Sequence, residues 1–224
     1  CLKRLFAVQN LRRGNGYSRF AAQVNAREGY ARGLDAFAFS AAVRDVKAQL
    51  AKYGFVEKHL IEAFALVRDA TRRALGITPY ETQLIAARTM LDNRLVEMAT
   101  GEGKTLAALL TAATAGLSGV PIHVITSNDY LVQRDAENLK PVYAALGLSV
   151  GFLTQASTPE QRRAAYACDI TYCTAKELVF DYLRDRLVFG QRRDDLQRRV
   201  AALDDASAAA PKPLLRGLCM ALVD

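Results

Sequence analysis

The sequence predicts an α/β protein in which a parallel sheet carries helices on both faces and a group of helices precedes it. Two observations support this fold class. Short apolar stretches alternate with helical patterns after residue 94, and strands separated by helices build a parallel sheet that is covered on both sides. A glycine-rich loop stands between the first apolar stretch and the first of these helices. In such folds ligands bind at the carboxyl ends of the strands.

The glycine-rich loop is Met98-Ala99-Thr100-Gly101-Glu102-Gly103-Lys104-Thr105. The apolar segment 94–98 leads into it and is expected to be a strand, and residues 106–110 open a helix behind it. Glycines let backbone N–H groups approach phosphate oxygens, and the helix adds its positive N-terminal end. Strand, loop and helix in this order are typical of a P-loop. We therefore predict that the chain binds a nucleoside triphosphate.

Residue types within the loop suggest their roles. The Lys104 ammonium is expected on the β- and γ-phosphates as a catalytic group, and the Thr105 hydroxyl is expected on Mg²⁺. Met98 stands where the strict pattern has glycine, a departure that helicase-like motors tolerate. The predicted fold is therefore RecA-like, of the helicase superfamily 2 type; the alternative is a glycine-rich turn with a solvated lysine. The other expected binding positions in the loop are Thr100, Gly101, Glu102 and Gly103.

Composition limits the class of protein. Of the 224 residues, 51% are hydrophobic and 24% charged, which is ordinary for a soluble globular protein. No apolar run approaches the roughly 18 residues of a membrane span, and no secretory signal is visible. The four cysteines and two histidines lack the spacing of a metal site, and the cysteines are expected to pack rather than react. Few cysteines together with a nucleotide-binding loop suit a reducing cytoplasm.

The net charge of +7 is concentrated at the N-terminus. Residues 1–78 hold 14 Lys and Arg against 6 Asp and Glu, whereas residues 79–224 hold 16 against 17. Segment 2–11 places apolar residues near one helical face and basic residues outside it. This pattern predicts a short basic amphipathic helix that ends at a turn over 14–16. Such a segment fits lipid headgroups or nucleic acid, and a solvated basic helix is an equal alternative.

Helical patterns precede the loop. Residues 39–54 and 60–76 each carry apolar side chains three or four positions apart and end at a glycine, which predicts two packing helices. Residues 17–34 are polar and basic with weak periodicity. A further helix after Pro79 carries Gln83, whose carboxamide can donate and accept at once, as the edge of adenine requires.

Strands and helices alternate after the loop. A helix is expected behind Thr158, an N-cap residue, because Pro159 takes the first helical position and Gln161 completes a capping box. Asp224 ends the last apolar run and would hold the Mg²⁺ shell as a Walker B aspartate does. The expected strands are 122–126, 148–153, 169–173 and 220–224, and the other expected helices are 129–146 and 175–186.

The extent and division of the chain are also predicted. Residues 190–206 are charged and expected to be helical, and residues 206–213 have the composition of a flexible connector. The chain starts without Met and stops at an apolar run ending in Asp, so we expect a piece of a longer protein. We predict N-terminal basic and packing helices over 1–78 and a first nucleotide-binding motor domain over 79–224, truncated at its Walker B strand.

Four blocks of the chain resemble one family, the SecA preprotein translocase ATPases, in their first nucleotide-binding domain. These blocks are 60–76, 97–105, 124–138 and 169–185. The resemblance implies an ATP-driven motor on the cytoplasmic face of the bacterial inner membrane, where it moves unfolded preproteins through a channel. By position, Gln83 would recognise adenine, Gly101 to Thr105 would hold the phosphates and Mg²⁺, and Asp224 would be the Walker B aspartate.

The resemblance further implies partners. They are preproteins, the translocation channel and acidic phospholipids, the last through the basic N-terminal helix; a homodimer stays open and nucleic acid is disfavoured. Departures at 173–176 and 178–179 leave open a housekeeping translocase or a specialised paralogue. Two rival functions are a nucleic-acid helicase-like ATPase of the same superfamily and a nucleotide-gated membrane adaptor without turnover. The piece alone is expected to be inactive, because such motors close their site with a second domain. Arg134 and Asp135 match a family motif without an assigned role.

Overall fold

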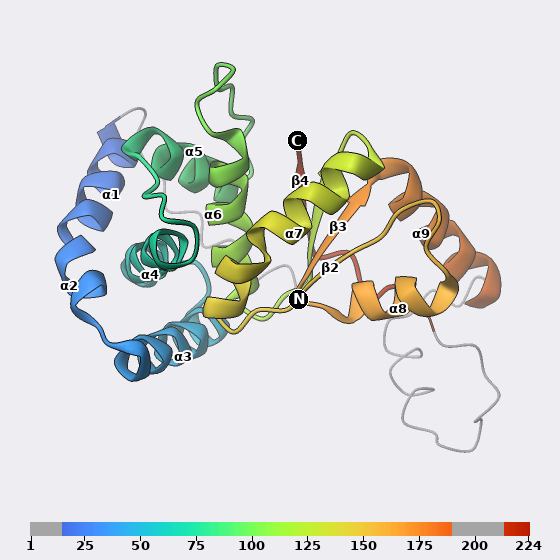
Figure 1. The fold of residues 1–224 in the computed structure, drawn as a ribbon, viewed down its shortest axis with the longest axis horizontal. Helices are drawn as coiled ribbons and strands as arrows, with labels where there is room; N and C mark the ends of the chain where they lie inside the picture. Colours follow the sequence, from blue (N-terminus) through green and yellow to red (C-terminus); the bar gives the residue numbers. More distant parts are fainter. Residues whose placement is uncertain (1–14, 190–212) are drawn as a thin grey trace.

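A computed structural model describes residues 15–189 and 213–224 (Figure 1). The predicted helix over 2–11, the charged segment 190–206 and nearly all of the connector 206–213 lie outside these residues. A four-stranded parallel sheet with the strand order β2-β3-β1-β4 forms one half of the molecule. Its strands are β1 (Ile122–Thr126), β2 (Val150–Phe152), β3 (Ile170–Thr174) and β4 (Met220–Val223). The predicted α/β fold and the four strands expected after residue 120 are confirmed.

Helices cover both faces of this sheet (Figure 1). Along β1 the side chains alternate between the faces, so Ile122 and Val124 join a large core while Ile125 packs with Cys173 of β3 in a smaller one. Burial on both faces explains why β1 and β3 are mostly apolar, with polar exceptions such as the buried His123 and Thr171. Helices α6 (Lys104–Gly116) and α7 (Asp129–Ala145) contribute to the large core, and α8 (Pro159–Ala167) and α9 (Ala175–Phe189) contribute to the small one.

Five helices precede the glycine-rich loop and form the other half of the molecule (Figure 1). They are α1 (Asn15–Ala26), α2 (Glu28–Gly33), α3 (Ala36–Tyr53), α4 (Glu57–Leu75) and α5 (Glu81–Leu91). Their apolar faces belong to the same large core as α6, α7 and the sheet. Phe20 of α1, for example, meets Phe64 of α4 edge to face with ring centroids 5.0 Å apart. The N-terminal helices are therefore packing elements on the sheet half, and the division at residue 78 stays a prediction.

The stretch 17–34, which shows little periodicity in sequence, is largely helical. It forms most of α1 and all of α2. The buried stripe of α1 consists only of Phe20, Ala21 and Val24, which is too short to stand out as a helical period. This helix is stabilised by packing against α4 and α5, and not by a strong apolar pattern of its own. The turn expected over 14–16 is wrong in its second half, because Asn15 and Gly16 begin α1.

The predicted strand over 94–98 is wrong. These residues adopt no regular structure and belong to a loop between α5 and α6 that extends away from the body of the molecule (Figure 1). Leu95 is fully exposed. A strand needs a hydrogen-bonded neighbour, and in the described ranges no strand pairs with this segment. The apolar pattern over 94–98 therefore predicted a strand that has no neighbouring strand to pair with in the described part of the chain.

Helix ends follow the predicted signals. Thr158 caps α8 through its hydroxyl, with Pro159 at the start and Gln161 completing the capping box. Gly54 and Gly76 end α3 and α4, and Gly76 has the left-handed conformation (φ 70°) that glycine adopts without a steric cost.

The chain returns from α9 to the sheet at a fixed point. Both carboxylate oxygens of Asp185, near the end of α9, accept backbone hydrogen bonds, one from Leu214 and one from Leu215, each 2.9 Å long. The side chains of Leu214 and Leu215 pack against the small core. The position of the chain just before β4 is therefore set by a single carboxylate and two leucines.

Candidate functional site

The glycine-rich loop leads directly into α6. Gly101 and Gly103 have φ angles of 89° and 84°, a backbone region that only glycine occupies readily. Gly103 is the N-cap of α6, a helix of 13 residues. The first N–H groups of such a helix have no partner within it and carry its positive end. The predicted helix behind the loop is confirmed, although it begins at Lys104, two residues before the expected position. Anion binding at this helix start stays a prediction.

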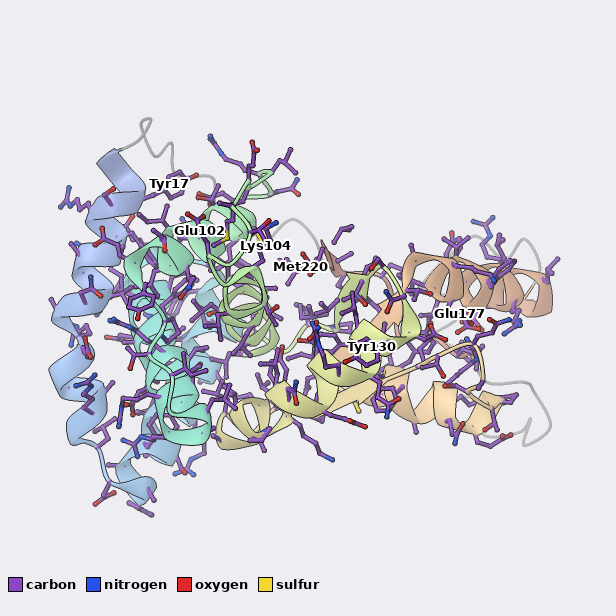
Figure 2. All side chains as sticks on the ribbon, turned by 45° about the horizontal axis from the view of Figure 1, so that its top comes forward. Tyr17, Glu102, Lys104, Tyr130, Glu177 and Met220 are labelled. Atoms are coloured by element: carbon purple, nitrogen blue, oxygen red, sulfur yellow. The ribbon has the colours of Figure 1, made fainter. Side chains whose placement is uncertain are left out.

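Lys104 and Thr105 occupy the first two positions of α6. Lys104 is exposed, and it makes no ion pair with the residues that the structure describes. Thr105 is half-buried. Figure 2 shows Lys104 and Glu102 at the same end of α6. A lysine at a helix start without a carboxylate partner is available to a phosphate group.

Gln83 of α5 is buried against the loop. Its Oε1 accepts a hydrogen bond from the Tyr80 backbone N–H (2.8 Å), and its Nε2 donates one to the carbonyl oxygen of Glu102 (2.7 Å). A Cβ atom at Gly103 would collide with this Nε2 atom. The carboxamide keeps a second N–H and a further lone pair, which is what contact with an adenine edge requires. The structure thus joins Gln83 to the loop, and adenine recognition stays a prediction.

The tip of the loop is closed by Glu102. Its backbone N–H donates to the carbonyl oxygen of Ala99 (3.3 Å), and its carboxylate Oε2 accepts from the Ala99 N–H (2.9 Å). Thr100 and Gly101 lie between these two residues and are exposed. The loop is therefore a compact turn at the surface, tied to the core mainly through Gln83.

Asp224 follows β4 at the carboxyl edge of the sheet. Its backbone N–H donates to the carbonyl oxygen of Ile125 (2.9 Å), so it continues the pairing of β4 with β1, and its side chain is exposed. The C-terminus and the glycine-rich loop both lie toward the top of Figure 1. Among the described residues, however, no hydrogen bond or ion pair joins Asp224 to the loop. The structure places Asp224 at the expected edge but leaves its metal role a prediction.

Arg134 of α7 lies within electrostatic reach of Asp224. Its Nε and Nη2 both donate to Oδ1 of the buried Asp135, at 2.9 and 2.7 Å. These hydrogen bonds, followed by the charge of Asp135 and, as the smallest contribution, that of Asp224, raise the pKa of Arg134. The motif that sequence analysis left without a role therefore forms a fixed cation beside the carboxyl edge.

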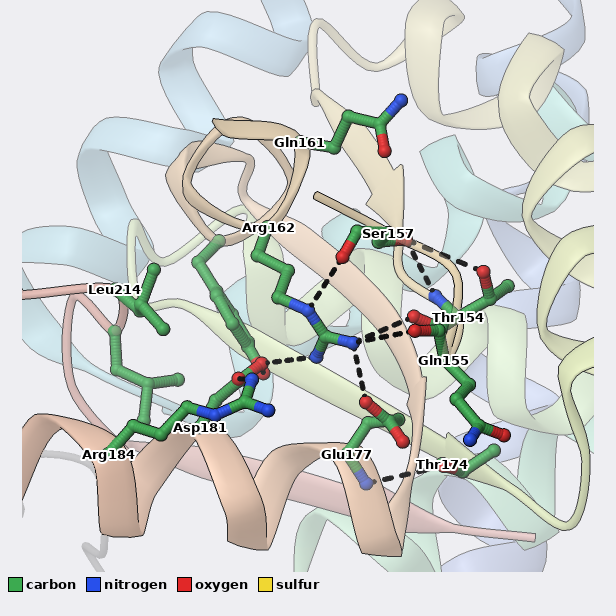
Figure 3. Close-up of polar contacts among 12 residues, drawn as sticks. Thr154, Gln155, Ser157, Gln161, Arg162, Thr174, Glu177, Asp181, Arg184 and Leu214 are labelled. Atoms are coloured by element: carbon green, nitrogen blue, oxygen red, sulfur yellow. Dashed lines mark hydrogen bonds and ion pairs between the residues drawn. The ribbon is translucent and has the colours of Figure 1, made fainter. Parts of the chain in front are cut away.

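A buried ionic cluster between α8 and α9 was not predicted (Figure 3). The guanidinium of Arg162 donates to Glu177 (2.6 Å) and to Asp181 (2.8 Å). It also donates to the carbonyl oxygens of Ser157 (3.1 Å) and Thr154 (2.9 Å). The three charged side chains are at most 7% exposed. The cluster ties the loop after β2 to α9.

Tyr166 and Arg184 complete this cluster. The Tyr166 hydroxyl donates to Oδ2 of Asp181 (3.0 Å), and Arg184 donates to Oδ1 (3.0 Å). Burial and the nearby charge of Asp181 raise the pKa of Tyr166 well above its ordinary value, so the hydroxyl stays a donor. The only signal in the sequence is that Glu177 and Asp181 are four positions apart on one helix, a spacing equally typical of a solvated face.

Other side chains fit structural roles. Burial raises the pKa of Cys173 to about 12 and also raises that of Cys168, which agrees with their predicted packing role. Burial lowers the pKa of His123, whose ring lies 5.9 Å from that of Tyr166. Within the described parts of the chain, no three His, Cys, Asp or Glu side chains gather as metal ligands. None of the helices described combines the length and the apolar composition needed to cross a membrane.

The parallel sheet, the glycine-rich loop at the start of α6 and the aspartate after β4 define an α/β domain of the P-loop, RecA-like type. Comparison with known protein families agrees with this class and makes it specific. The chain belongs to the family of SecA DEAD-like domains, whose model matches residues 2–224.

Curated relatives carry related names. The chain is 46% identical to protein translocase subunit SecA 2 of Bordetella avium over 206 residues, and 46% identical to that of Nitrosospira multiformis over 208. It is 40% identical to protein translocase subunit SecA of Stutzerimonas stutzeri over 208 residues. These alignments cover 92% of this chain. The chain spans only 31% of the length of the first two relatives and 23% of the third.

Proposed function

We propose that this chain is the ATP-binding part of an ATP-driven motor that moves unfolded preproteins across the bacterial inner membrane through a translocation channel. The observation that carries the proposal is the loop at the start of α6. It has two left-handed glycines, the buried Gln83 against it, and an exposed Lys104 that pairs with no carboxylate among the described residues. The relatives that are named protein translocase subunits support the proposal that the motor transports proteins. The rest of the cycle belongs to the longer protein.

Each residue of the site has a distinct proposed task. Lys104 and the N–H groups at the start of α6 bind the β- and γ-phosphates, and Gln83 binds the adenine edge through its free N–H and lone pair. Thr105 and Asp224 hold the Mg²⁺ that arrives with ATP, and this ion would neutralise phosphate charge when bound. Thr100, Gly101, Glu102 and Gly103 shape the loop around the phosphates. A second domain closes the site, so this piece alone turns over ATP poorly.

The proposed setting is the cytoplasmic face of the inner membrane, where the protein is peripheral. Preproteins and the channel are the proposed partners, together with acidic phospholipids that meet the basic segment 2–11. A homodimer is compatible with this arrangement. Nucleic acid is not part of the proposal, and the helicase-like and adaptor alternatives become outcomes of the experiments below.

The first test removes the Lys104 ammonium. We expect Lys104→Ala to weaken Mg·ATP binding at least about 100-fold, because the main cation facing the phosphates is lost. Binding is measured by calorimetric titration of the purified protein. Lys176→Ala, which removes an exposed lysine at the start of α9, serves as the matched control. Unchanged ATP affinity in Lys104→Ala would refute the P-loop assignment.

The second test concerns the motor. The ATPase rate of the full protein is measured with acidic liposomes that carry the channel, with and without an unfolded preprotein, and separately with RNA. Stimulation by membranes and preprotein supports the translocase function. Stimulation by RNA alone would make the chain part of a helicase-like ATPase, and binding without turnover under every condition would indicate a nucleotide-gated adaptor.

A further inference from the structure

Glu102 is held at the tip of the loop by three hydrogen bonds. Its N–H and its carboxylate both bond to the backbone of Ala99, and its carbonyl oxygen accepts from Gln83. Only one of these three bonds uses the side chain. The shape of the tip is therefore largely set by the backbone, and the carboxylate is an additional group fixed beside it.

The charge of this carboxylate is not paired with a cation in the described part of the chain. Glu102 forms no ion pair with the residues that the structure describes, although Lys104 is only two positions away (Figure 2). The carboxylate Oε2 instead takes a backbone N–H of the loop as its donor, 2.9 Å away. A held negative charge thus stands beside the proposed phosphate site, where Lys104 and the start of α6 offer positive groups. Phosphates that enter the cradle are repelled by it in proportion to their own charge.

We propose that Glu102 is a specificity-determining residue that lowers the affinity of the loop for nucleoside triphosphates relative to diphosphates. A triphosphate carries one more negative charge than a diphosphate, so it is repelled more strongly by the same carboxylate. In a water-like dielectric, one additional unit of charge repelled by an exposed carboxylate changes a binding constant about threefold. This inference rests on the proposed nucleotide-binding function of the loop.

The test separates the charge of Glu102 from its hydrogen bond. Glu102→Gln keeps an oxygen acceptor for the Ala99 N–H but removes the charge, whereas Glu102→Ala removes both. The dissociation constants for ADP and ATP are measured by calorimetric titration without Mg²⁺ and at two salt concentrations. Glu97→Gln is the matched control, because Glu97 is an exposed carboxylate just before the loop. Thermal unfolding establishes that each variant is folded.

We expect Glu102→Gln to tighten ATP binding more than ADP binding, so that the ratio of the two constants moves about threefold toward ATP. The change should shrink at high salt, because salt screens exposed charges over about 10 Å at 0.1 M. An unchanged ratio in Glu102→Gln, or the same shift in Glu97→Gln, would overturn the inference. Unchanged nucleotide affinity in Lys104→Ala would instead refute the proposed function of the loop, so the two failures are distinguishable.

Discussion

The glycine-rich loop and the cluster around Arg162 differ in the burial and pairing of their charged side chains. In the cluster, Arg162 meets Glu177 and Asp181 in the interior, and two backbone carbonyls take further N–H groups of its guanidinium. In the loop, Lys104 and Glu102 are exposed and make no ion pair with described residues. Buried charges must be paired within the protein, whereas an unpaired charge at the surface remains available to a ligand. The difference separates groups that maintain the fold from groups that await a partner.

The largest expected effect comes from the cluster. Arg162→Met should lower the free energy of unfolding by about 3 to 5 kcal/mol, because it leaves the buried Glu177 without its cation and Asp181 with only the half-exposed Arg184. Urea unfolding measures this loss. Arg163→Met is the control, since Arg163 is the next residue, is half-exposed and reaches Glu160 only at 3.8 Å. A loss below about 1 kcal/mol would mean that the cluster is not the stabilising element that its burial indicates.

A smaller effect is expected from one hydroxyl of the same cluster. Tyr166→Phe removes a hydrogen bond to the Asp181 carboxylate and should cost about 2 kcal/mol, as hydrogen bonds to charged groups do. The control is Tyr130→Phe, at a tyrosine that is 73% exposed. Equal free energies of unfolding for the two variants would show that Arg162 and Arg184 satisfy Asp181 without the hydroxyl.

In the loop, we expect a substitution to change ATP binding more than it changes stability. Gly103→Ala is expected to cost only about 1 to 2 kcal/mol of stability, the usual cost of a left-handed non-glycine residue. It should nevertheless weaken ATP binding at least about tenfold, because the new Cβ displaces Gln83 from the loop. Gly29→Ala, at a site with ordinary φ and no atom within 4 Å of the added Cβ, is the control. Normal ATP affinity in Gly103→Ala would show that the contact between Gln83 and the loop has no role in binding.

The sequence predicted the parts of the fold that depend on local patterns. The strands expected over 122–126 and 169–173 form as β1 and, shifted by one residue, as β3, and α8 begins at the capping box of Thr158. Short-range patterns and capping chemistry decide these elements. The glycine-rich loop at the start of α6 was found in the same way. These predictions need no knowledge of which elements become neighbours.

The parts that were missed depend on distant neighbours. The stretch 94–98 has a strand pattern but no partner strand among the described residues, and α1 is helical because α4 and α5 cover its short apolar stripe. Arg162 finds its carboxylates 15 and 19 positions away, on a different helix. The contact of Gln83 with Glu102 spans 19 positions. Such contacts exist only after the chain has folded, so patterns of nearby residues do not contain them.

The carboxylate of Asp185 has a consequence for the candidate metal ligand at the other end of β4. It fixes Leu214 and Leu215 from the end of α9, and β4 with Asp224 follows a few residues later. The position of Asp224 therefore depends on a side chain that belongs neither to the sheet nor to the glycine-rich loop. A substitution at Asp185 is expected to act on the carboxyl edge from a distance, by releasing the chain just before β4.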